Sequence, residues 1–116
     1  MTKQALLSCV LLLAVCARAE DKRIGAAEAV DHYDKKMTVT GTVAQVTIRE
    51  KLVYLNLDKP FPQTPLAGVI FARSTNAFGD LSALKGKQVE LTGKIEEFKE
   101  RPQIVLTSTN QLKVIP

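Results

Sequence analysis

The sequence predicts a small all-β protein in which five strands wrap into one barrel, with a short helix before the first strand and another between the third and fourth. Three observations support this fold class. Apolar and polar residues alternate with a period of two over most of the chain after residue 36, as in strands with one buried face. The alternation changes phase once, near residue 44, which indicates a bend in the first strand. Turn-forming residues, including three prolines between residues 60 and 65, separate the alternating stretches.

The first 19 residues are expected to be a cleaved signal peptide. A basic start at Lys3 precedes an apolar run over residues 5–15, which is too short to span a bilayer. Small residues at Ala17 and Ala19 predict cleavage between Ala19 and Glu20, so we expect a periplasmic or secreted product. The alternative is an apolar helix belonging to the core.

Cys16 raises the possibility of a lipid anchor, because lipoprotein signals also end in a cysteine. Val15 before it is branched, whereas small residues normally occupy that position, so we expect a soluble exported protein without an anchor. Both cysteines, Cys9 and Cys16, lie inside the expected signal. The mature domain, residues 20–116, therefore has no thiol and no disulfide although it is expected in an oxidising compartment.

The bulk properties of the mature chain fit one domain with one hydrophobic core. Removal of Lys3 and Arg18 leaves 14 of the 16 basic residues against 12 acidic ones, so the net charge falls from +4 to +2. This value neither demands nor excludes a polyanionic partner. We expect a monomer with no integral membrane span.

The first two elements follow from a change of period. Apolar or small residues recur at helical spacing over residues 24–33, which predicts a short helix. The first strand, residues 37–48, keeps its apolar residues at odd positions up to Val43 and at even positions from Val46. We therefore expect a β-bulge near residue 44, which lets one strand bend and serve both sides of a small barrel.

The rest of the chain alternates strands with polar turns, and residues 49–51 form the first of these turns. In order, we expect a second strand at 52–57, a proline-rich loop at 58–65 and a third strand at 66–72. A short helix after Asp80, with Gly86 in the position after its end, precedes a fourth strand at 89–95. A turn at 99–102 then leads to a fifth strand from Gln103, for which residues 112–115 are a candidate extension.

Several runs resemble a known family: Val39 to Val43, Leu84 to Lys87 leading into Val89 to Ile95, and Arg101 to Leu106. They are similar to bacterial OB-fold domains of the nucleic-acid-binding, anticodon-binding-like superfamily, in particular small exported single-domain members. The resemblance covers the chain from about Ala26 to Leu112. It implies a binding face on the outer side of strands one to three, flanked by the loops between strands one and two and strands four and five. These motifs specify the fold better than the ligand.

Catalysis has little support in the mature sequence. It contains one histidine, His32, which we expect to be a solvated helix residue, and it has no cysteine. Glu96 and Glu97 are adjacent in a strand and would point to opposite faces, so they form no carboxylate pair. We therefore expect no enzymatic activity, no metal site and no cofactor.

Single-stranded nucleic acid is held by cations that follow the phosphates and by aromatic rings on which bases stack. The two loops that bracket the implied face carry cations, and strands two and three carry aromatic residues. The predicted nucleic-acid-binding residues, for DNA or RNA, are Arg49, Lys51, Tyr54, Asn56, Phe71, Arg73, Lys99 and Arg101.

The sequence leaves two alternatives open. The loop cations alternate with Glu50 and Glu100, so they can equally be solvated turn charges that partly cancel. The same groove, or the loop from Pro60 to Pro65, could instead contact an envelope protein or a glycan, for which salt would matter little. We expect a non-catalytic binding module in either case.

Overall fold

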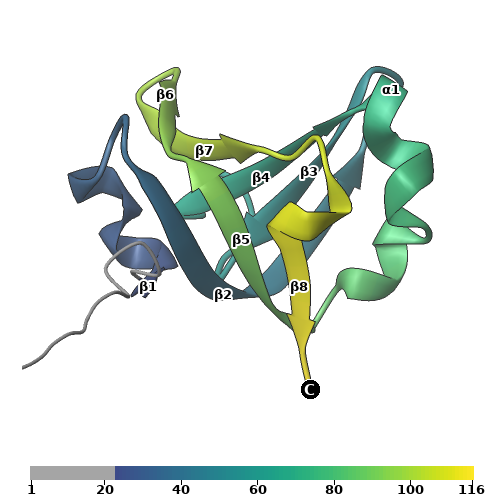
Figure 1. Ribbon diagram of the computed structural model, residues 1–116, viewed down its shortest axis with the longest axis horizontal. Coiled ribbons are helices and arrows are strands. Elements are labelled where there is room, and N and C mark those ends of the chain that lie inside the picture. Colours follow the sequence, from purple (N-terminus) through teal and green to yellow (C-terminus); the bar gives the residue numbers. More distant parts are fainter. Residues whose placement is uncertain (1–22) are drawn as a thin grey trace, which may run out of the picture.

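The computed structural model describes residues 23–116, which form one strongly curved β-sheet with short helices at its margins (Figure 1). The expected signal peptide and both cysteines lie outside the described residues. The strands are β1 (Arg23–Gly25), β2 (Lys36–Ile48), β3 (Leu52–Leu57), β4 (Leu66–Phe71), β5 (Gln88–Lys94), β6 (Glu96–Phe98), β7 (Arg101–Val105) and β8 (Leu112–Ile115). The all-β class is confirmed.

The helical segments are all short. They are the 3-10 helices η2 (Ala26–Asp31), η3 (Asn76–Phe78), η4 (Leu81–Leu84) and η5 (Thr109–Gln111), and the α-helix α1 (Ala72–Thr75). Both expected helical regions are therefore present, between β1 and β2 and between β4 and β5. Asp80 caps η4 as expected, because its carboxylate accepts a hydrogen bond from the Ser82 amide at 3.2 Å. None of the helices in the described part of the chain is long and apolar enough to cross a membrane.

The long strand β2 belongs to two ladders. Its first half, from Lys36 to Thr42, pairs antiparallel with β5, and its second half, from Val43 to Ile48, pairs antiparallel with β3. The register shifts between Val43 and Gln45, which confirms the predicted bulge. The unforeseen strand β1 adds a parallel partner to the first half of β2.

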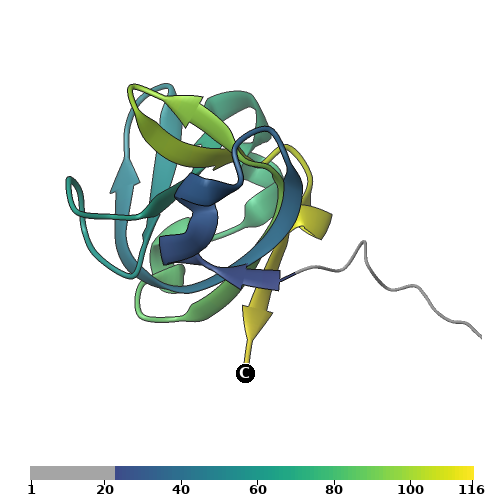
Figure 2. The ribbon, with the colours of Figure 1, turned by 90° about the vertical axis from the view of Figure 1, so that its left-hand side faces the viewer.

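The strand order is β6-β7-β4-β3-β2-β5-β8, with β4 and β7 parallel. Seen end-on, the sheet curls around its interior (Figure 2). No ladder joins β5 to β7 within residues 23–116, so the sheet is open there and the predicted closed five-stranded barrel is not confirmed. The strand β8 is also distinct from the predicted tail, because it pairs antiparallel with β5 instead of extending β7.

A side chain bridges the open side of the sheet. Gln111 Nε2 donates to the carbonyl oxygens of Thr92 in β5 and Val105 in β7, at 3.0 and 3.1 Å. Gly93 allows this approach, since a Cβ atom there would lie 2.8 Å from Ile104 Cγ2. The two strands are thus held together without a backbone ladder.

The core fills the concave side of the sheet. It follows the predicted alternation of β3, where Val53, Leu55 and Leu57 are buried. The largest fully buried side chains are Leu55, Leu57, Leu66, Ile70, Leu91, Ile95, Ile104 and Leu106. Burial of these apolar side chains is the main stabilising term for a domain of this size.

Candidate nucleic-acid interface

The outer face of β2, β3, β4 and β7 carries a regular array of side chains. Residues that are register partners in neighbouring strands point to the same side of a sheet. One row consists of Thr47, Tyr54, Val69 and Val105, and the next consists of Gln45, Asn56, Ala67 and Gln103. The bulge in β2 produces this arrangement, because it brings Gln45 and Thr47 onto the outer face while Val46 turns inward beside Leu55.

A groove of about 470 Å³ runs over this array. Its floor comes from the four strands, and its walls come from the loop between β3 and β4 and from the β6–β7 hairpin. It is lined by Gln45, Thr47, Arg49, Tyr54, Asn56, Phe61, Thr64, Ala67, Phe98, Lys99, Arg101, Pro102 and Gln103.

Three aromatic rings line the groove. Tyr54 is half-buried on the floor, whereas Phe61 and Phe98 are 63% and 48% exposed on the walls. Each phenylalanine has a cation over its ring: Arg101 Cζ lies 4.9 Å from the Phe61 centroid, and Lys99 Nζ lies 5.4 Å from the Phe98 centroid. The predicted nucleic-acid-binding residues did not include Phe61 or Phe98, and the loop that carries Phe61 was considered only as a contact for another kind of partner. Both residues stand next to turn-forming residues in the sequence, and this is the pattern from which their place on the groove walls could have been predicted.

The loop between β3 and β4 is fastened to its surroundings. Arg101 Nη1 donates to the Pro62 carbonyl oxygen, and the Phe61 amide donates to Gln45 Oε1 at 2.9 Å. Thr64 Oγ1 lies 2.9 Å from the carbonyl oxygens of both Leu57 and Leu66. The wall that carries Phe61 is therefore held in place before any ligand arrives.

The charge in the groove has one sign. Arg49, Lys99 and Arg101 line it, and no aspartate or glutamate does. The neighbouring carboxylates Glu50 and Glu100 line two other hollows, the first together with Arg49 and the second together with Lys99 and Arg101. The groove is therefore a locally cationic surface on a chain of modest net charge.

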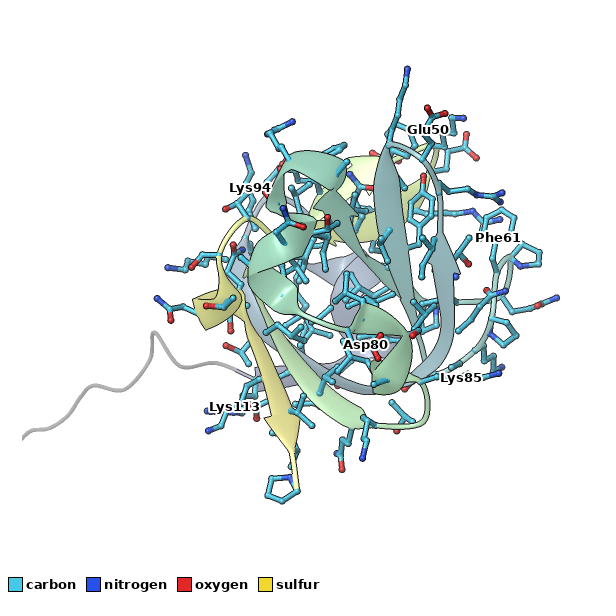
Figure 3. The ribbon with its side chains drawn as sticks, turned by 90° about the vertical axis from the view of Figure 1, so that its right-hand side faces the viewer. Glu50, Phe61, Asp80, Lys85, Lys94 and Lys113 are labelled. Carbon is cyan, nitrogen blue, oxygen red and sulfur yellow. The ribbon has the colours of Figure 1, made fainter. Side chains whose placement is uncertain are left out.

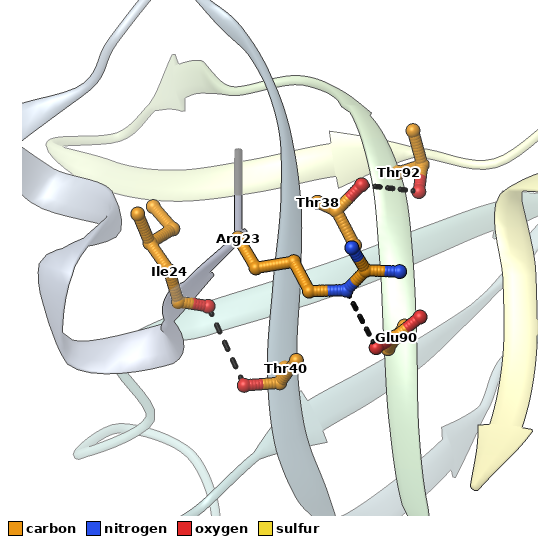
Figure 4. Close-up of polar contacts among 6 residues, drawn as sticks. All are labelled: Arg23, Ile24, Thr38, Thr40, Glu90 and Thr92. Carbon is orange, nitrogen blue, oxygen red and sulfur yellow. Dashed lines mark hydrogen bonds and ion pairs between the residues drawn. The ribbon is translucent and has the colours of Figure 1, made fainter. Parts of the chain in front are cut away.

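Among residues 23–116 the ion pairs lie elsewhere, on the β1, β2 and β5 side and near Lys94 (Figure 4). Arg23 Nε is 3.0 Å from Glu90 Oε2, and Thr38 and Thr92 share a hydrogen bond of 3.0 Å between their hydroxyls. Figure 3 shows Phe61 on the side of the molecule opposite Lys94 and Lys113. The paired charges and the groove cations thus occupy different surfaces.

The structure brings five of the eight predicted residues to the groove: Arg49, Tyr54, Asn56, Lys99 and Arg101. Asn56 is only 3% exposed, and its Nδ2 donates to Gln45 Oε1 at 2.8 Å. Lys51, Phe71 and Arg73 do not line the groove. Phe71 and Arg73 form a separate pair, with Arg73 Cζ 5.2 Å from the Phe71 centroid.

His32 differs from its expected setting. It follows η2 as a half-buried residue, and its Nδ1 is buried without a hydrogen-bond partner. It does not line the groove. In the described part of the chain, no three His, Cys, Asp or Glu side chains are grouped so that they could hold a metal ion.

Comparison with known proteins gives likeness of fold only. No protein-family model and no curated protein sequence matches the chain. Among solved structures, it is similar to the S. pombe Stn1–Ten1 complex (TM-score 0.50, 19% identity, 69% of this chain and 57% of that one). It is also similar to a protein described as an aspartyl-tRNA synthetase from Leishmania major Friedlin (0.57, 7%, 90% and 22%) and to Entamoeba histolytica asparaginyl-tRNA synthetase (0.53, 16%, 82% and 24%).

These likenesses support an OB-like fold. The chain spans between about a fifth and three fifths of the length of each neighbour. What the neighbours do is therefore a property of longer proteins at low sequence identity.

Proposed function

We propose that this protein is a non-catalytic module that binds single-stranded nucleic acid in the groove over β2, β3, β4 and β7. The observation that carries the proposal is the composition of the groove lining: three cations, three aromatic rings and no carboxylate. Cations bind phosphates and rings stack on unpaired bases, which is the combination that single strands require. Two structural neighbours are named as aminoacyl-tRNA synthetases, enzymes whose substrate is a nucleic acid.

The roles of the side chains follow from their exposure. Arg49 and Lys99 are exposed and would meet phosphates, whereas Phe61 and Phe98 would offer bases the ring surface that Arg101 and Lys99 leave uncovered. Tyr54 lies on the floor between them. A double-stranded helix keeps its bases stacked inside and leaves these rings unused, so single strands are preferred.

The direct test is fluorescence anisotropy with labelled single-stranded DNA and RNA at several salt concentrations. The variant Arg49→Gln/Lys99→Gln removes two groove cations, and Lys85→Gln/Lys113→Gln removes two exposed cations that do not line the groove. The groove variant should bind several-fold more weakly and lose about 1.4 from the salt slope, because each phosphate contact with a single strand contributes about 0.7. The control should behave as the wild type. No association at tens of micromolar protein in low salt would refute the proposal.

A second candidate is a protein-interaction module of the cell envelope. Phe61 favours it, since a phenylalanine that is 63% exposed between two prolines is typical of a contact residue. The two functions differ in salt dependence, because a contact made by Phe61 would persist at high salt. Loss of binding to an envelope protein in Phe61→Ala, with no such loss in Arg49→Gln/Lys99→Gln, would favour this candidate.

A further inference from the structure

The row Gln45, Asn56, Ala67 and Gln103 crosses the floor of the groove. Three of its members are amides, and Ala67 has the smallest side chain in the row. Register places Ala67 between Asn56 and Gln103, so the floor has a shallow gap flanked by hydrogen-bonding groups. Such a floor offers directional polar contacts to a flat ligand that enters between the walls.

The orientation of the Gln45 amide is fixed by its neighbours. The Phe61 backbone N–H can only donate, so the Gln45 atom 2.9 Å from it must be the oxygen. The Asn56 atom 2.8 Å from the same oxygen must then be the donor Nδ2. Gln45 Oε1 thus accepts two hydrogen bonds, which uses both of its lone pairs.

Gln45 Nε2 is left without a partner. No hydrogen bond from it to another described residue is present, and it is not a buried unsatisfied atom, since His32 Nδ1 is the single such atom in the described chain. Gln45 Nε2 therefore presents N–H donors to solvent in the groove at a fixed position. The side-chain amide of Gln103, half-buried in the same row, also makes no hydrogen bond to residues 23–116 and can turn either way.

We infer that this floor reads the edge of one unpaired base and prefers bases that carry a ring carbonyl oxygen, namely thymine, uracil, cytosine or guanine, over adenine. The inference rests on the proposed function. A carbonyl oxygen accepts a hydrogen bond from Gln45 Nε2. Adenine has no carbonyl: its acceptors are ring nitrogens, and its amino group is a donor that cannot pair with another donor. The exposed rings Phe61 and Phe98 would pack against the base, and Ala67 leaves space for its edge.

The test compares oligo-dT with oligo-dA of equal length in matched variants. Gln45→Glu keeps an oxygen for Phe61 and Asn56 but replaces the donor with an acceptor. Gln88→Glu makes the same change in charge at an exposed position on β5 outside the groove lining. Any intrinsic stacking of oligo-dA is common to both proteins and cancels in the ratio of the two affinities.

The wild type and Gln88→Glu should prefer oligo-dT by about three- to tenfold, the contribution of one hydrogen bond. Gln45→Glu should abolish or reverse this preference. An equal ratio in Gln45→Glu and Gln88→Glu would overturn the inference while leaving the proposed function intact. If neither oligonucleotide binds the wild type, the proposed function fails.

A second variant addresses the space above Ala67. Ala67→Leu fills the gap without changing charge, and Ala83→Leu adds the same atoms at an exposed position in η4. With both folds verified by thermal melting, Ala67→Leu should bind oligo-dT at least about tenfold more weakly than Ala83→Leu, because the base edge can no longer reach the floor. Equal affinities of these two variants would show that no base enters there.

Discussion

Arg101 acts on both the groove and the loop that walls it. Its guanidinium stacks over Phe61 and donates to the Pro62 carbonyl oxygen, while its charge remains without a carboxylate partner in the described structure. The position of this arginine in a predicted loop was enough to place it in the site, but its partners lie about forty positions earlier in the chain. Contacts between residues so far apart in the sequence depend on the final packing of two loops, and no local sequence pattern predicts them.

Arg101→Lys separates the charge from the stacking. Lysine keeps the positive charge but has no planar group to stack on Phe61. The loop should open more often, so the Phe61 amide, which donates to Gln45 Oε1, should exchange with solvent about fivefold faster, the effect of about 1 kcal/mol. Amide exchange measured by NMR tests this, with Arg49→Lys as the control because Arg49 does not contact the loop through a hydrogen bond. Unchanged Phe61 exchange in Arg101→Lys would contradict the proposed fastening.

The β6–β7 hairpin shows how element boundaries depend on turn geometry. The polar run from Lys99 to Pro102 predicted a turn at residues 99–102, followed by a strand from Gln103. The turn is instead the two residues Lys99 and Glu100, with φ of 51° and 67°, and Pro102 lies inside β7. Pro102 precedes Gln103, the first residue of β7 that pairs with β4, so the β4 ladder begins only after the proline.

A positive φ at two successive residues is the geometry of a tight hairpin turn that favours asparagine and glycine. Glu100→Gly should relieve the left-handed conformation and raise the free energy of unfolding by about 1 kcal/mol. Glu50→Gly, in a turn residue without positive φ, serves as the control and should give no gain. Urea denaturation of the two variants measures the difference. Equal or opposite effects would show that the turn carries no strain at position 100.

At the scale of the whole molecule, the phase change of apolar residues after Val43 was sufficient to predict the bend in β2, because the polarity of each strand residue indicates whether it lies on the buried or the exposed face. The side on which the sheet remains open could not be predicted in this way. On that side β5 and β7 are bridged by Gln111, a residue outside the strands, whose amide donates to carbonyl groups of both. In the sequence, nothing distinguishes a glutamine with this bridging role from a solvated glutamine in a polar stretch.

Gln111→Ala tests whether this side chain holds the curved sheet together. The substitution removes the donor Gln111 Nε2 from the carbonyl oxygens of Thr92 and Val105. It also removes the acceptor Gln111 Oε1 from the amides of Thr107 and Ser108. At about 1 kcal/mol for each hydrogen bond, with some contacts replaced by water, the free energy of unfolding should fall by about 2–4 kcal/mol. Chemical denaturation measures this loss, and Gln88→Ala on exposed β5 provides the matched control. Gly93→Ala should act in the same direction, because its Cβ would press on Ile104 and on Gln111 Nε2, 3.1 Å away. If Gln111→Ala were as stable as Gln88→Ala, apolar burial alone would have to hold β7 against β5. The double variant Gln111→Ala/Gly93→Ala would then lose no more free energy of unfolding than Gly93→Ala by itself.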